Sequence, residues 1–179
     1  MGKMKTLLLH TCCAPCVTVP LQRLQADFDV TCYYYNPNIH PIEEYQKRLA
    51  ELQRFSDEMG ISLIVEHYDP DNWFEQVKGL EPEPEGGQRC AVCFAMRLGR
   101  TAAQAQAVGF HAFTTTMSIS PHKNSELLNQ LGKQAAEKNS VEYVIANFKK
   151  QDGFRKSNEL SRRYNFYRQN YCGCIFSQR

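Results

Sequence analysis

Seven of the eight cysteines in this 179-residue chain fall into three short clusters. The clusters read Cys12-Cys13-x-x-Cys16, Cys90-x-x-Cys93 and Cys172-x-Cys174. The first two stand where helices are expected to begin, and the free N–H groups and dipole of a first helical turn lower the pKa of a thiol. Because the thiolate is the form that binds metals, these spacings predict a metal or redox centre. The eighth cysteine, Cys32, lies within an expected strand and is predicted to be a buried apolar residue.

Three kinds of centre would use clustered cysteines. Structural disulfides are disfavoured because nothing in the sequence indicates secretion. A structural zinc ion takes four ligands and would leave three of the clustered cysteines unexplained or require a second site. An iron–sulfur cluster also takes four thiolates, and the surplus could then form a second metal site or a redox pair. The iron–sulfur interpretation is favoured, with structural zinc as the main alternative. Arg89 and Arg97 stand close enough in sequence to Cys90 and Cys93 to offset thiolate charge.

The pair Cys172 and Cys174 lies near the end of the chain, separated by one glycine. A disulfide between such residues closes a small ring, and strained disulfides are the labile, oxidising kind. A chain end is often mobile, which suits a pair that closes over an open site. The alternative is a frayed tail with two incidental thiols.

Strand and helix patterns alternate along the chain. We expect strands at 5–9, 29–35, 61–68, 110–119 and 141–148. We expect helices from about residue 15, with Pro20 kinking or restarting the first, and at 42–59, 93–108, 125–138 and 157–169. Residues 69–89 are expected to be irregular. This alternation predicts a mostly parallel sheet with helices on both faces.

Ligands bind such sheets beyond the carboxyl ends of the strands. The loops expected there carry most of the unusual polar residues, and we place the active site at this edge. The loop residues are His10, Thr11, Cys12, Cys13 and Cys16, then Asn36, Asn38 and His40, then Ser120, His122, Lys123 and Asn124, and last Lys149 and Lys150.

Positive charge is concentrated near the C-terminus. The whole chain has a net charge of only +2, but residues 149–168 hold seven basic and two acidic side chains, leaving −3 for the rest. This segment is either a solvated helix face or a phosphate-binding strip. Within it, Tyr164 and Tyr167 are predicted to be core residues, and Phe166 is predicted to be exposed and able to stack on a base.

Neither a secretion signal nor a membrane span is expected. The apolar run near the start is three leucines long, against the roughly 7–15 residues of a signal core. No segment approaches the roughly 18 apolar residues of a membrane span. We therefore expect a cytoplasmic protein without a membrane partner. The sequence leaves the oligomeric state open.

The chain resembles the epoxyqueuosine reductases of the QueH type. The motifs that carry the likeness, in order, are LLHTCCAPC, YYYNPNIHPIEEYQKR, GGQRCAVCFAMRLGRTA, FTTTMSISPHKN and FKKQDGFRKSNELSRRYNFYRQNYCGC. Together they span nearly the whole chain. The resemblance implies a single Rossmann-like (HUP-like) α/β domain over residues 1–179, with the basic helix and Cys-x-Cys tail of about 149–179 closing over the site. It also implies reduction of epoxyqueuosine to queuosine in tRNA, with a 4Fe–4S cluster and an adjacent second iron or redox-active cysteine pair. The tRNA is the substrate partner, and the sequence does not identify the electron donor.

Carried over by motif, the resemblance implies roles for individual residues. Cluster ligands are Cys12, Cys13, Cys90 and Cys93. The paired Cys172 and Cys174 are a disulfide/dithiol or ligands of the second iron, to which Cys16 is a further candidate ligand. The predicted substrate-binding residues are Asn36, Asn38, Lys123, Asn124, Lys149, Lys150 and Arg162.

The reaction also needs a proton donor at the predicted rim. His122 and His10 are the catalytic candidates chosen, because the pKa of histidine is near neutral. His40, Glu43 and Tyr45 are further candidates by loop position. A metal that binds the epoxide oxygen would act as a Lewis acid and weaken its C–O bond.

Two other classes of protein share some of these features. An ATP-using tRNA-thiolating enzyme would have the same opening fold, but its phosphate loop would be rich in glycine, and the loop after the first strand here has none. A zinc-stabilised RNA-binding module without catalysis would use the same cysteines. Anaerobic protein that is brown indicates an iron–sulfur cluster, and colourless protein with stoichiometric zinc indicates the module.

Overall fold

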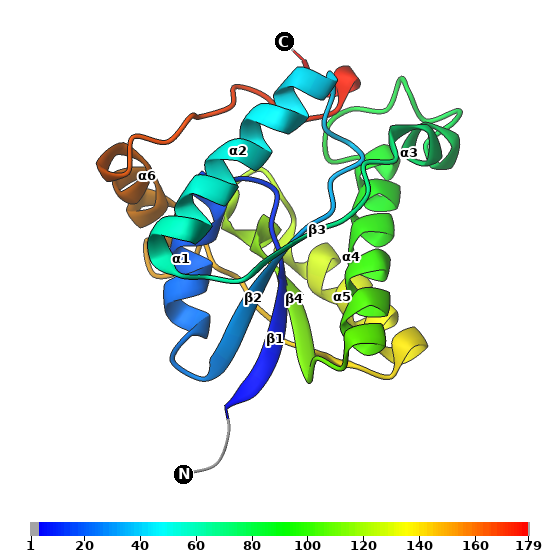
Figure 1. Ribbon diagram of the computed structural model, residues 1–179. Coiled ribbons are helices and arrows are strands. Elements are labelled where there is room, and N and C mark those ends of the chain that lie inside the picture. The colour runs from blue at the N-terminus through cyan, green and yellow to red at the C-terminus, as the bar shows by residue number, and fades with distance from the viewer. Residues whose placement is uncertain (1–3, 179) are drawn as a thin grey trace.

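The computed structural model describes residues 4–178 and contains a five-stranded sheet whose strands all run parallel (Figure 1). The strand order is β3-β2-β1-β4-β5, so the first strand lies at the centre. In register, Leu7 of β1 lies beside Val30 on one side and Ala112 on the other. The predicted α/β class with a mostly parallel sheet is confirmed. The strands are β1 (Lys5–His10), β2 (Phe28–Tyr34), β3 (Leu63–Val65), β4 (Ala112–Thr115) and β5 (Glu142–Tyr143).

Helices cover both faces of this sheet. Successive side chains of a strand alternate between faces, so Leu7 and Leu9 of β1 belong to one apolar core and Leu8 to the other. The first core is closed by α1 (Ala14–Leu24) and α2 (Ile42–Met59), and the second by α4 (Gln88–Val108) and α5 (Ser125–Asn139). Among the helices of residues 4–178, none combines the length and apolar character that crossing a bilayer requires.

The second helix follows its sequence pattern closely. Tyr45, Leu52 and Phe55 are buried against the sheet, as the amphipathic spacing predicts. Gly60 ends the helix with a left-handed φ of 65°, which glycine adopts without strain. Ile42 and Met59 were expected on the same buried face, but they are 41% and 46% exposed because they lie at the two ends of the helix.

Three of the expected strands are shorter than the apolar pattern suggested. β3 has three residues, β5 has two, and β4 stops at Thr115. A 3₁₀ turn, Thr116–Ile119, follows β4 because the Thr115 hydroxyl accepts a hydrogen bond from the backbone N–H of Met117. Beyond β4 the apolar Met117 and Ile119 remain buried, whereas beyond β5 Ile145 is 60% exposed.

The expected irregular segment at 69–89 contains a helix, α3 (Pro70–Gln76), so that prediction was wrong. The signal was present in the sequence. Asp69 caps the helix by accepting a hydrogen bond from the backbone N–H of Asn72, and proline follows at the first helical position. The next helix, α4, also begins five residues before the expected start, so Cys90 and Cys93 both lie in its opening turns.

The last long helix, α6 (Gly153–Arg163), starts and ends earlier than expected. Its start depends on Gly153, where an added Cβ would lie 1.7 Å from the carbonyl oxygen of Phe148. At its other end Asn165 adopts a left-handed φ of 50° and turns the chain away. The first helix also differs from expectation, since α1 runs through Pro20 without restarting.

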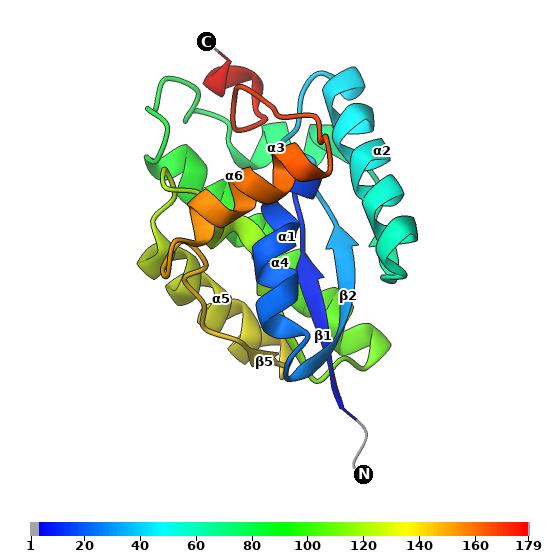
Figure 2. The same ribbon diagram turned by 90° about the vertical axis from the view of Figure 1, so that its left-hand side faces the viewer.

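After α6 the chain crosses the end of the sheet toward which β1 and β2 point (Figure 2). It passes beside α2 and ends, within the described residues, in a short 3₁₀ turn at Ile175–Ser177. Cys172 and Cys174 lie on this crossing segment, at the edge of the sheet where the strand-end loops gather.

Candidate metal and substrate site

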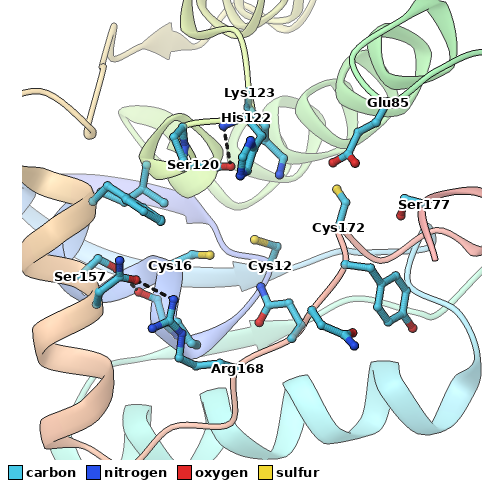
Figure 3. A pocket seen from close by; sticks show the side chains of 18 residues that line it. Cys12, Cys16, Glu85, Ser120, His122, Lys123, Ser157, Arg168, Cys172 and Ser177 are labelled. Atoms are coloured by element: carbon cyan, nitrogen blue, oxygen red, sulfur yellow. Dashed lines mark hydrogen bonds between the residues drawn. The ribbon is translucent and has the colours of Figure 1, made fainter. Parts of the chain in front are cut away.

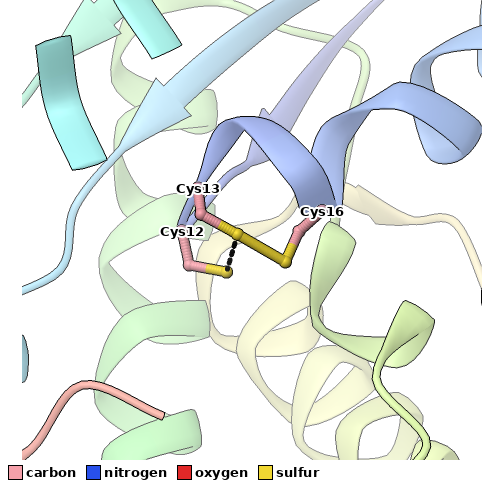
Figure 4. Close-up of side chains that lie close together, drawn as sticks. All are labelled: Cys12, Cys13 and Cys16. Carbon is pink, nitrogen blue, oxygen red and sulfur yellow. Dashed lines mark hydrogen bonds between the residues drawn. A yellow bond between two sulfur atoms is a disulfide. The ribbon is translucent and has the colours of Figure 1, made fainter. Parts of the chain in front are cut away.

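The first cysteine cluster forms a compact group at the start of α1 (Figure 4). Cys13 is the residue before the helix, in extended conformation, and Cys16 lies in the first turn, which Pro15 favours. The sulfurs of Cys13 and Cys16 are joined as a disulfide, and the Cys12 Sγ lies 3.9 Å from the Cys13 Sγ. All three sulfurs lie within 4.8 Å of one another. That spacing suits three thiolates around one metal ion, once the disulfide is reduced.

The other four clustered cysteines meet a short distance away. Cys90 and Cys93 come from α4, Cys172 and Cys174 come from the C-terminal crossing segment, and all four line one small cavity beside Trp73. Cys172 also lines a larger cavity together with Cys12 and Cys16. The two groups of cysteines therefore line neighbouring cavities that share Cys172. Within residues 4–178, only Cys12, Cys13 and Cys16 lie close enough together to hold one metal ion. The eighth cysteine, Cys32, is buried in β2 as predicted, and burial raises its pKa to about 12.

A buried arginine lies between the two groups of thiols. Arg97 is 2% exposed, and its guanidinium lies 4.0 Å from the Cys93 Sγ and donates to the side-chain oxygen of Asn36 at 2.8 Å. Burial lowers the pKa of Arg97, but the thiolates of Cys93 and Cys12 outweigh this and raise it. Burial likewise raises the pKa of Cys93, and the Arg97 charge opposes that rise. The prediction that Arg97 offsets thiolate charge is confirmed by this geometry.

Lys123 has a similar relation to Cys172. Burial raises the pKa of the Cys172 thiol, but the charges of Lys123 and Arg97 more than compensate, so the pKa is lowered overall. Burial in turn lowers the pKa of Lys123, while the thiolates of Cys172 and Cys12 raise it above its ordinary value. Cys172 is thus stabilised as a thiolate.

The segment that carries Cys172 and Cys174 is held by hydrogen bonds from Arg48 of α2 and from His40 in the loop before α2. Arg48 donates hydrogen bonds to the carbonyls of Cys172 at 2.8 Å and Tyr171 at 3.1 Å, and it pairs with Glu44 at 2.7 Å. The backbone N–H of His40 donates to the Gly173 carbonyl at 2.8 Å.

Gly173 can lie against Ile39 and Arg48 because it has no side chain. Its φ is +144°, and an added Cβ would lie 3.1 Å from Ile39 and 3.4 Å from the Arg48 guanidinium. Arg48 was not predicted as a functional residue from the sequence. It lies three residues after Tyr45 and four before Leu52, so helical spacing already put it on the buried face.

The larger cavity has a volume of about 460 Å³, which is within the range of small-molecule sites. Figure 3 shows the sulfurs of Cys12, Cys16 and Cys172 at its wall, with Lys123 on one side and Arg168 on the opposite side. Arg168 is oriented by the side-chain oxygen of Asn158, to which it donates at 2.7 Å. The cavity therefore brings thiols and cations together.

Two histidines predicted to be catalytic have different surroundings. His122 is exposed and lines the larger cavity. His10 is fully buried at the end of β1, and its ring nitrogens lie 3.0 Å from the Thr115 hydroxyl and 3.0 Å from the Tyr35 carbonyl. Burial, followed by the nearby Arg97 charge, holds the pKa of His10 well below its ordinary value. His10 lies outside the cavity lining, so the geometry gives it a structural role.

The other proton-donor candidates also lie outside the cavity lining. His40 is buried and holds the C-terminal segment, since its Nδ1 accepts from the backbone N–H of Ile175 at 3.3 Å. Tyr45 is buried in the core, and Glu43 is exposed in the first turn of α2.

Of the predicted substrate-binding residues, Lys123 alone lines the larger cavity. Asn36 is buried, donates to the Thr11 carbonyl at 2.9 Å and accepts from Arg97, so it positions that arginine. Asn38 lines the small cavity beside the cysteines. Asn124 caps α5, since its side-chain oxygen accepts from two backbone N–H groups.

The predicted basic residues near the C-terminus have structural partners or lie outside the cavity lining. The Lys149 ammonium donates to the Lys123 carbonyl at 2.6 Å and so ties two rim loops together. The carbonyl of Lys150 accepts from Arg23 at 2.9 Å. Arg162 is exposed in the last turn of α6. The aromatic prediction for this segment was partly wrong, because Phe166 is 7% exposed and packs against Phe55.

Arg89 was also predicted to offset thiolate charge, and its charge does oppose the rise that burial causes in the pKa of Cys90. It has a second role. Its guanidinium donates to the carbonyls of Leu80, Glu81 and Glu83 and so holds the loop before α4. That loop brings Glu85 to the cavity wall (Figure 3). Glu85 was not predicted, since nothing in the local sequence indicates which of several acidic residues there faces inward.

The family model for the epoxyqueuosine reductase QueH matches residues 7–179. The chain belongs to the QueH family of epoxyqueuosine reductases. It is therefore an oxidoreductase family member, and the resemblance seen in the sequence is confirmed.

Three QueH relatives illustrate the match. The epoxyqueuosine reductase QueH of Streptococcus pyogenes serotype M1 is 42% identical over 178 residues, covering 96% of this chain and 70% of the relative. That of Histophilus somni is 45% identical over 175 residues, covering 97% and 72%. That of Thermotoga maritima is 34% identical over 177 residues, covering 97% and 91%.

A solved structure supports the fold. A predicted subunit of tRNA methyltransferase from Methanocaldococcus jannaschii superposes with a TM-score of 0.56, covering 87% of this chain and 74% of the other. The two sequences are only 10% identical, so the likeness concerns the fold alone. It agrees with the α/β fold and parallel sheet described above.

Proposed function

We propose that this chain reduces epoxyqueuosine to queuosine in tRNA, and that the modified nucleotide enters the larger cavity. Membership of the QueH family supports the reaction. The observation that carries the placement is that thiols from separate segments, Cys12, Cys16 and Cys172, wall one cavity of about 460 Å³. A cavity of that size accommodates a nucleoside side chain and base.

The chemistry sets what the site has to supply. Converting an epoxide to an alkene breaks both C–O bonds, takes up two electrons and two protons, and releases the oxygen as water. The electrons come from an external donor, which neither the sequence nor the fold identifies. The protons have to come from groups at the cavity. His122 is the histidine that lines it, and we assign it the proton-donor role.

The cysteines fit a negatively charged metal centre. Arg97 is buried, its Nε has no hydrogen-bond partner within residues 4–178, and the charges around it are those of thiolates. The buried Trp73 side chain lies against Cys93, and its interaction with that thiol opposes the rise in the thiol's pKa. A buried cation without an anionic partner is costly. An anionic thiolate-bound cluster would offset that cost, and N–H groups near its sulfurs would tune its potential.

We therefore propose a 4Fe–4S cluster on Cys12, Cys13, Cys90 and Cys93. Bound there, such a cluster would supply one-electron transfer, and a two-electron reduction would then call for a second redox element beside it. Cys172 and Cys174, as a dithiol or as ligands of a second iron with Cys16, are the residues we assign to it. Reduction of the disulfide between Cys13 and Cys16 has to precede ligation.

The basic segment 149–168 and the crossing segment that follows it are proposed to form the tRNA-facing cover of the site. Arg168 supports this, because it projects from the cover into the cavity (Figure 3). The Arg168 guanidinium and the Lys123 ammonium lie on opposite sides of the cavity, so phosphate and sugar groups would meet a cation on either side. The cytoplasm, where tRNA is modified, is the proposed location.

A turnover assay tests the function. Anaerobically purified chain with a chemical reductant is incubated with tRNA carrying epoxyqueuosine, and the nucleosides are separated after digestion. The proposal predicts conversion to queuosine with loss of one oxygen in mass. Reduced, metal-loaded protein that binds this tRNA yet leaves the epoxide intact would refute it.

One observation favours a second candidate. The spacing of Cys12, Cys13 and Cys16 within 4.8 Å also suits a zinc ion, as in a structural RNA-binding module. Metal analysis of anaerobic protein separates the candidates, because the module would contain zinc without iron or sulfide.

A further inference from the structure

A single carboxylate lines the larger cavity within the described residues, and it belongs to Glu85. The same residue lines the small cavity beside the cysteines and a third one next to Lys123. Figure 3 shows its carboxylate directed toward the side where Lys123 and Cys172 lie. Glu85 also opposes the lowering of the Cys172 pKa, which places its charge within electrostatic reach of that thiol.

The loop that carries Glu85 is held in place from both sides. Arg89, which is buried, donates to the carbonyl of Glu81 at 2.8 Å and to that of Leu80 at 3.3 Å. The backbone N–H of Gly86 donates to the Cys90 Sγ at 3.2 Å, and Gly86 turns the chain with a φ of +89°. The loop is thus tied to one of the cysteine segments, and the fold fixes the backbone from which the Glu85 side chain projects.

The substrate of the proposed reaction carries a positive charge near the reacting atoms. Its epoxide ring is joined to the 7-deazaguanine base through a secondary amine, and the amine-bearing carbon is next to an epoxide carbon. An alkyl amine of this kind is protonated near neutral pH. If the epoxide lies against Cys12 and Cys172, the ammonium lies within a few bonds of them, and Glu85 is the carboxylate that lines the same cavity.

The remaining charges of the wall suit a different part of the substrate. Lys123 and Arg168 are cations, and they match phosphate or sugar oxygen atoms. A cationic amine placed against them alone would be repelled. Lys123 lies beside Cys172, as Glu85 does, whereas Arg168 lies on the opposite side of the cavity. Glu85 therefore offers the amine a carboxylate beside the thiols, and Arg168 offers a phosphate a cation at the far side.

We propose that the Glu85 carboxylate binds the cationic amine that links the epoxide ring to the base, and so selects and orients the modified nucleotide. This inference rests on the proposed function, since it takes epoxyqueuosine as the substrate. It makes Glu85 a specificity residue. A charge-assisted hydrogen bond of this kind corresponds to about a tenfold change in affinity or more.

Binding measurements test this without turnover. The probes are tRNA whose 7-deazaguanine carries a cationic aminomethyl group and the same tRNA with a neutral cyano group. Metal-loaded wild type is expected to bind the aminomethyl tRNA about tenfold more tightly than the cyano tRNA. Glu85→Gln should bind both equally, at the level of the cyano tRNA. Glu81→Gln is the matched control, because Glu81 lies in the same loop with an exposed side chain and outside the cavity lining.

The outcomes separate this inference from the proposed function. A preference lost in Glu85→Gln and kept in Glu81→Gln, with iron and sulfide content unchanged, supports it. An unchanged preference in Glu85→Gln, or no preference in the wild type, overturns it even if the wild type reduces epoxyqueuosine. Loss of metal from Glu85→Gln also overturns it, because the carboxylate would then serve the metal centre. Failure of the wild type to reduce the epoxide concerns the proposed function, whatever the binding data show.

Discussion

Arg48 is predicted to control whether the segment with Cys172 and Cys174 is docked. Its side chain is 1% exposed and donates to two carbonyls of that segment. A hydrogen bond from a charged donor contributes about 1.5–3 kcal/mol. Taking the lower value for both bonds, Arg48→Met should weaken docking by about 3 kcal/mol. The undocked fraction should then rise roughly 150-fold.

Hydrogen exchange measures this directly. The backbone N–H groups of Ile175 and His40 bond across the docked contact, so both should exchange much faster in Arg48→Met. Turnover should fall, while the sheet keeps its protection. Arg48→Lys should be intermediate, because a single ammonium does not reproduce the planar fork of the guanidinium.

Arg54→Met is the matched control on the same helix. Arg54 is partly exposed and donates to the carbonyl of Tyr164, before the crossing segment, so its loss should leave the exchange of Ile175 unchanged. Exchange at Ile175 that is the same in Arg48→Met as in the wild type would refute the docking argument. So would equal acceleration in both variants.

Three further predictions concern charge and packing. Lys123→Met should raise the pKa of Cys172, because the charge that lowers it is lost. At neutral pH the metal-free, reduced variant should then hold less Cys172 thiolate and be alkylated more slowly than the wild type. An unchanged pH profile of alkylation would contradict this. Gly153→Ala should destabilise the fold by about 3 kcal/mol, since the new Cβ would overlap the Phe148 carbonyl. Gly99→Ala is the control and should not destabilise it, because the space around Gly99 is open. Thermal unfolding of the two variants tests this, and equal melting temperatures would contradict it. If the basic segment binds phosphates, the affinity for tRNA should fall steeply with salt, and a salt-independent affinity would argue against it.

Local patterns were enough to predict the sheet and to place the first cysteine cluster at its edge. Alternating apolar strands and amphipathic helices imply parallel strands whose ends meet, and Cys12, Cys13 and Cys16 follow β1 there. The other clustered cysteines follow no strand directly, since Cys90 and Cys93 lie in α4 and Cys172 and Cys174 lie on the segment after α6. The limits of the strands were less predictable. An apolar run such as 110–119 does not distinguish a strand from a buried 3₁₀ turn, and the side chain of Thr115 decides it.

The roles of polar residues depended on tertiary contacts that no local pattern contains. His10 follows the buried leucines and was expected in the rim loop, but it is the last residue of β1 and bonds to Thr115 of the neighbouring strand. Phe166 follows a basic helix and was expected to be exposed, but the turn at Asn165 directs it into the core. Glu85 lines the cavity from a loop whose backbone carbonyls are held by the buried Arg89.

The most direct test of this account is the iron and sulfide content of anaerobically purified protein, compared between wild type and two buried cysteine variants. Cys93→Ala removes a proposed ligand, and Cys32→Ala is a control of equal size in the sheet. The account predicts iron and sulfide in the wild type and in Cys32→Ala, and their loss in Cys93→Ala with the fold retained. Wild type that holds zinc without sulfide, or Cys93→Ala that keeps its full complement of iron, would contradict it.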